Sequence, residues 1–117
     1  MSAKLHLING EAAPDVAAIA ADKVLEGAPV TETRIDYQRG DILFAGEWSA
    51  NEGAWRVSYE EWEFCHMLSG ACELVPEDGP AIRYGVGDSF VIEPGFEGVW
   101  RVLEPMRKRF VVTLKPD

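Results

Sequence analysis

The fold of this chain is decided by the stretch Glu61–Val75, which reads EWEFCHMLSGACELV. Large apolar side chains fill both halves of the stretch, and the dipeptide Ser69-Gly70 divides them. This predicts two strands, 61–68 and 71–75, joined by a two-residue hairpin turn. On the first strand Glu63, Cys65 and Met67 share one face, because side chains alternate along a strand. The stretch therefore predicts a β-hairpin that carries one carboxylate on an otherwise apolar face.

The same alternation of short strand and turn continues on both sides of this hairpin. Further strands are predicted at 42–48, 54–59, 81–84, 89–93, 99–103 and 107–114. Turns rich in glycine and proline separate them, among them Gly85–Asp88, Glu93–Phe96 and Glu104-Pro105. About eight short strands at this spacing predict an antiparallel all-β sandwich or barrel.

The first 40 residues have a different composition. An alanine-rich run, 14–25, begins with Pro14 and is followed by Gly27 and Pro29, which predicts a short helix. We therefore expect an N-terminal arm with a short helix at 1–40 and a barrel at 41–117. With 117 residues the chain has room for one structural domain overall.

Composition and charge argue against several classes of function. The net charge of −9 repels nucleic acid, and the late basic group Arg101, Arg107, Lys108 and Arg109 is too small to reverse this. No apolar run approaches the length of a membrane span, and Met1–His6 is not followed by the apolar segment of a secretory signal. With only two cysteines, a reduced cytoplasmic protein is the expectation.

Two segments resemble the sequence motifs of the cupins, which are double-stranded β-helix barrels of jelly-roll topology (RmlC-like). These segments are Glu63–Gly70 and Gly87–Gly95. Together with Trp55–Val57, Pro94–Phe96 and Trp100–Lys108, they resemble more narrowly the DUF861 family, also called cupin 3 or EutQ-like cupins. The resemblance covers residues 42–114. It implies kinship with the cupin halves of (S)-ureidoglycine aminohydrolase, and a homodimer as the expected assembly.

The resemblance also implies a metal site, but most of its ligand positions are altered here. Glu63 stands at the position of the glutamate ligand, whereas Tyr59, Val57 and Gly98 stand where histidines are expected. His66 falls on the opposite face of its strand from Glu63, which favours a sheet surface or a subunit contact. Because a tight site needs three or four converging ligands, we predict no intrinsic metal, with a divalent metal as the disfavoured alternative.

A small-molecule pocket is predicted inside the barrel. Its expected lining is Trp48, Trp55, Val57, Tyr59, Glu63, Cys65, Gly98 and Trp100. Gly98 leaves space where a histidine is expected, and the aromatic walls with one carboxylate suit a small uncharged or cationic ligand. Glu63 is either paired with Tyr59 or an arginine for structural reasons, or it acts as a general acid or base or accepts a hydrogen bond from a ligand's amine or amide. Cys65 is predicted to be a core residue, too far from Cys72 for an easy disulfide.

Three functions remain open at this point. The preferred one is a binding module that holds a small molecule without an intrinsic metal. The second is an enzyme acting on a small nitrogenous or ureide-like metabolite, as the kinship with ureidoglycine aminohydrolase implies. A metal-independent isomerase or lyase, with Glu63 and Tyr59 as acid and base, is its variant. The third is a structural role in which edge strands and the N-terminal arm contact another subunit.

Overall fold

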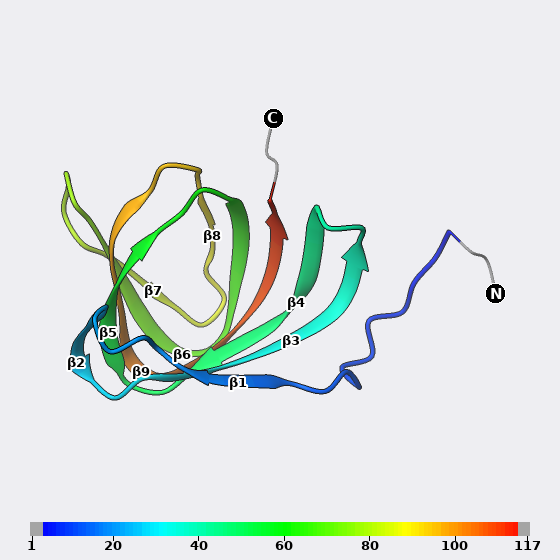
Figure 1. Ribbon diagram of the computed structural model, residues 1–117, viewed down its shortest axis with the longest axis horizontal. Helices are drawn as coiled ribbons and strands as arrows, with labels where there is room; N and C mark the ends of the chain where they lie inside the picture. The colour runs from blue at the N-terminus through cyan, green and yellow to red at the C-terminus, as the bar shows by residue number, and fades with distance from the viewer. Residues whose placement is uncertain (1–3, 115–117) are drawn as a thin grey trace.

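Nine β-strands curl into a barrel in the computed structural model, which describes residues 4–114 (Figure 1). In chain order they are β1 (Asp15–Ala18), β2 (Val24–Gly27), β3 (Val30–Arg39), β4 (Leu43–Ala50), β5 (Gly53–Ser58), β6 (Trp62–Pro76), β7 (Ile82–Gly85), β8 (Ser89–Ile92) and β9 (Glu97–Thr113). All pairings are antiparallel, and none of the described residues is helical. The predicted all-β fold class is confirmed.

Two long strands, β6 and β9, hold the barrel together. They pair with each other from Trp62 opposite Thr113 to Pro76 opposite Gly98. On its other edge β6 pairs first with β8 and then with β7, while β9 pairs first with β5 and then with β4. The result is two half-sheets, β1-β3-β4-β9-β6-β8 and β2-β5-β9-β6-β7, that share the two long strands. This is the double-stranded arrangement of a cupin jelly roll.

The predicted hairpin turn at Ser69-Gly70 is wrong, because β6 runs through this dipeptide without reversing. The pairing with β9 slips instead between Met67 and Cys72, so the stretch is a bulged bend in a continuous strand. Gly70 has a φ of 78°, and a Cβ there would lie 2.2 Å from the Pro105 carbonyl oxygen. Glycine is needed here because the two backbones approach closely. In the sequence alone, a glycine with this role looks the same as a glycine in a turn.

The predicted helix at 14–25 is also wrong. This run contains β1 and the start of β2, which are joined by the turn at Ala20–Lys23. β1 pairs with β3, from Asp15 opposite Thr33 to Ala18 opposite Val30, and β2 pairs with β5. Backbone hydrogen bonds to these two strands outweigh the helix preference of alanine, which is only a weak prior. β3 itself pairs along the length of β4.

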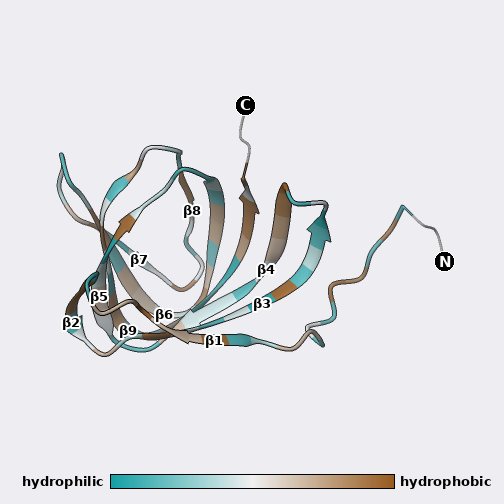
Figure 2. Cartoon of the chain, in the orientation of Figure 1, coloured by the Kyte–Doolittle hydropathy of each residue, from teal (hydrophilic) through white to brown (hydrophobic). Residues whose placement is uncertain are grey.

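The core lies between the inner faces of the two half-sheets. Its fully buried large side chains include Met67, Trp100 and Met106, and Tyr84 stacks on Phe90 with ring centroids 3.8 Å apart. β3 is mostly hydrophilic, with a brown apolar stretch in its middle (Figure 2). In the part of the chain that the structure describes, no helix has the length and hydropathy of a membrane span.

Candidate functional site

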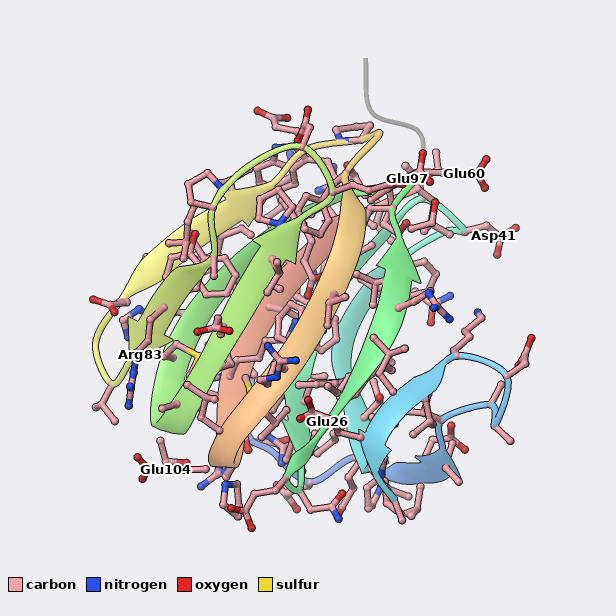
Figure 3. The ribbon with its side chains drawn as sticks, turned by 90° about the vertical axis from the view of Figure 1, so that its left-hand side faces the viewer. Glu26, Asp41, Glu60, Arg83, Glu97 and Glu104 are labelled. Atoms are coloured by element: carbon pink, nitrogen blue, oxygen red, sulfur yellow. The ribbon has the colours of Figure 1, made fainter. Side chains whose placement is uncertain are left out.

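A lysine and a glutamate form an ion pair inside the barrel. The Nζ of Lys108, on β9, lies 2.8 Å from Oε2 of Glu63, on β6. Both residues are buried, with 3% and 5% of their surfaces exposed. Other carboxylates, such as Asp41, Glu60 and Glu104, extend away from the strands (Figure 3). A charge this far from water requires a partner, and each of these two residues supplies it for the other.

The Lys108 ammonium is also surrounded by aromatic rings and a thiol. Its Nζ lies 4.4 Å from the ring centroid of Trp100 and 4.7 Å from that of Trp48. The Sγ of Cys65 lies 3.5 Å away. Indole faces attract cations through their quadrupoles, most strongly where water is absent. The ammonium is therefore held by one carboxylate and two indole rings, an arrangement that we call the ammonium cage (Glu63, Trp48 and Trp100).

The ionisation of the groups around the cage follows from burial and from this ion pair. Burial alone would lower the pKa of Lys108, but the attraction of Glu63 outweighs it and holds this pKa above its usual value. Burial raises the pKa of Tyr59 far above its ordinary value, and the charge of Lys108 opposes this only in part. Burial likewise raises the pKa of the Cys65 thiol to about 12. At neutral pH the lysine is thus charged, while the phenol and the thiol are neutral.

A cavity of about 360 Å³ borders this ion pair. Its walls come mainly from the inner faces of β3, β4, β5 and β9, and they are mostly apolar or aromatic. Thr31, Thr33 and Tyr59 add uncharged polar groups, and Ile19 contributes from the segment between β1 and β2. The volume lies in the range of pockets that hold small organic molecules.

Six of the residues predicted to line a pocket border this cavity. They are Trp48, Trp55, Val57, Tyr59, Glu63 and Trp100. Cys65 does not border it but is fully buried beside Lys108.

The predicted role of Gly98 is wrong. A Cβ at Gly98 would lie 2.1 Å from the carbonyl oxygen of Val75, so the missing side chain admits the neighbouring backbone of β6 rather than a ligand. Gly98 does not border the cavity.

Lys108 is the residue of this site that the sequence analysis does not identify. In the sequence it stands within the late basic group of Arg101, Arg107, Lys108 and Arg109, which gives it no role of its own. Strand parity carries the missing signal: Met106, Lys108 and Phe110 are buried, whereas the two arginines between them are exposed. Lys108, rather than the predicted arginine, is the basic partner of Glu63.

The outer face of the same sheet carries a second charged cluster around Glu47. This carboxylate, 9% exposed, contacts Arg107, lies 3.4 Å from Arg34 and lies 3.7 Å from Arg109. Burial would raise the pKa of Glu47, but the hydrogen bond from Arg107 and the three positive charges together hold it below its usual value. His66 also lies on this face, with Nδ1 2.7 Å from the Ser89 hydroxyl, as strand parity predicts.

The donor set around Glu63 does not fit a metal ion. Among the described residues there is no cluster of three or more histidine, cysteine, aspartate or glutamate side chains that could hold one. The neighbours of Glu63 are a protonated lysine, a neutral phenol and a thiol whose pKa is raised. A divalent cation needs converging anionic or neutral donors, and the ammonium would repel it.

The fold is that of a cupin, and the chain belongs to the family of EutQ-like cupin domains, whose family model matches residues 38–110. The chain is similar to a DUF861-family protein from Pseudomonas syringae pv. tomato, with a TM-score of 0.80 and 16% identity over 91% of this chain and 46% of that one. It is also similar to the EutQ protein of Clostridium difficile, with a TM-score of 0.65 and 17% identity over 73% of this chain and 63% of that one.

A DUF861-family protein from Thermotoga maritima is 30% identical, with a TM-score of 0.55, over 56% of this chain and 75% of that one. No curated protein matches the chain. Because the chain spans only part of the Pseudomonas and Clostridium proteins, at low identity, these likenesses establish the fold and not a shared activity.

Proposed function

We propose that this cupin domain binds a small organic molecule in the cavity beside the Glu63–Lys108 pair, without a resident metal. The observation that carries the proposal is a buried ion pair at the wall of an aromatic cavity. A buried ion pair contributes little net stability compared with apolar residues of similar volume, because both charges lose their water. Groups with strongly perturbed pKa values that border a cavity are, in contrast, typical of binding and catalytic sites.

The second candidate is a metal-independent enzyme, an isomerase or lyase. The closeness of Tyr59, Glu63 and Lys108 at one wall of the cavity favours it. Tyr59 and Lys108 keep their protons at neutral pH and could donate one, while Glu63 is the group that could accept one. A metal-dependent reaction of the ureidoglycine aminohydrolase kind has no support in the donor set around Glu63.

A cavity-filling variant tests the proposal. Val57 borders the cavity, so Val57→Phe places a ring in the space that the ligand would occupy. The matched control is Val86→Phe, because Val86 lies outside the cavity and is 69% exposed. Both variants and the wild type are screened by thermal shift against small amides, ureides, amines and acids.

We expect one class of compound to raise the Tm of the wild type and of Val86→Phe, but not that of Val57→Phe. Equal shifts in all three proteins would place binding outside the cavity and contradict the proposal. Compounds that bind are then followed by NMR in the presence of protein, since turnover would favour the enzyme and unchanged spectra the binding module.

A further inference from the structure

We propose that the ligand of this cavity is electrically neutral and carries a hydrogen-bond acceptor, and that cations are excluded because Lys108 already occupies the ammonium cage. This inference rests on the proposed function and adds the chemical class of the ligand. It also narrows the sequence-based expectation, which allowed a cationic ligand.

The first step is the occupation of the cage. A carboxylate with two indole faces is the set of groups that recognises an ammonium ion. Here the ammonium of Lys108 takes this place, 2.8 Å from Glu63 and within 4.7 Å of both ring centroids. A second cation in the cavity would find Oε2 of the carboxylate and the two rings already in contact with Lys108, and it would be repelled by the Lys108 ammonium.

The second step is the charge balance of the cavity. Of the described residues that border it, only Glu63 and Lys108 carry charge, and these two charges cancel. Tyr59 borders the cavity and Cys65 lies behind Lys108; both stay neutral at neutral pH. An anionic ligand would lose its hydration and would find no unpaired positive charge in the cavity to bind. It should therefore bind more weakly than a neutral ligand.

The third step is the balance of hydrogen-bond donors and acceptors. Lys108 and Tyr59 bring N–H and O–H donors to the cavity wall, where both also interact with Glu63, the one carboxylate among the described residues that border it. Trp100 borders the cavity, but its unpartnered indole Nε1 is buried away from it. A carbonyl or ether oxygen on the ligand would therefore accept from Lys108 or Tyr59.

Three probes of matched ring size separate the charge classes: benzamide, benzoate and benzylammonium. Binding to the wild type is followed by 15N NMR of the tryptophan indole N–H groups, with the Trp100 signal assigned from Trp100→Phe. We expect benzamide to bind and to shift the Trp100 signal, and both charged probes to bind more than about tenfold more weakly. Lys108→Met removes the ammonium from the cage, so benzylammonium should bind this variant at least about tenfold more tightly than it binds the wild type.

The controls are the exposed Lys23→Met, which should keep the wild-type order of affinities, and Glu63→Gln/Lys108→Met, which should lose the gained benzylammonium binding. If Lys108→Met does not fold, the wild-type order decides alone. Benzylammonium binding to the wild type as tightly as benzamide, and abolished by Val57→Phe, would overturn the inference and keep the proposed function. Binding that survives Val57→Phe would overturn the proposed function. Absence of binding by all three probes would overturn the inference.

Discussion

Removing the ammonium from Glu63 should cost far more stability than removing both charges together. Only 5% of Glu63 is exposed in the native chain, and its partner Lys108 lies 2.8 Å away. In Lys108→Met the carboxylate stays buried but has lost this partner. Breaking a buried pair from one side costs about 3–5 kcal/mol. A domain of this size has roughly 5–15 kcal/mol of total stability, so this loss is a large fraction of it. Methionine keeps most of the side-chain volume, which limits the contribution of an empty cavity.

Urea unfolding followed by tryptophan fluorescence measures this loss. Glu63→Gln/Lys108→Met should recover at least about 2 kcal/mol relative to Lys108→Met, because no unpaired buried charge remains. Lys23→Met, an exposed charge removal, should stay within about 0.5 kcal/mol of the wild type. The reasoning is refuted if Lys108→Met loses less than about 1 kcal/mol, or if the double variant loses as much as the sum of the two single ones.

Three further predictions concern the rest of the barrel. The pKa of Glu47 is lowered in the folded chain, so its contribution is present above the unfolded pKa of about 4.3 and is lost as pH falls through the folded pKa. The Tm difference between wild type and Glu47→Gln should therefore shrink between pH 7 and pH 3; a constant difference would contradict this. Gly98→Ala should lower the Tm by several degrees, because its Cβ would lie 2.1 Å from a carbonyl oxygen, whereas Gly85→Ala, with nothing within 4 Å, should not. Both free cysteines are buried with raised pKa values, so thiol reagents should label Cys65 and Cys72 only after unfolding; rapid labelling of the native protein would argue against their burial.

The strand pattern and the cupin motifs were sufficient to predict the fold class, because alternation and turn residues are local signals. Two local signals were misleading. Ser69-Gly70 serves the close approach of β6 to Pro105 on β9, and the alanine run from Pro14 is held as strands by pairing with β3 and β5. In both places the deciding contact lies far along the chain, beyond the reach of local propensity.

In the site, too, local sequence patterns predicted some residues, whereas others depend on contacts far along the chain. The buried face of β5 and β6 followed from parity, which brought Trp55, Tyr59 and Glu63 to one cavity. Lys108 could not be assigned by its neighbours alone, since its burial depends on Glu63, which lies 45 positions away along the chain. The homodimer and the cytoplasmic location stay predictions.

The most direct test of the central claim asks which cation faces Glu63. Protein produced without a chelating tag is incubated with manganese, iron or zinc, desalted, and analysed for metal per chain. If the ammonium of Lys108 is that cation, wild type and Glu63→Gln should both retain far less than one metal per chain. One metal per wild-type chain, lost in Glu63→Gln, would contradict the claim and place a metal where the lysine now lies.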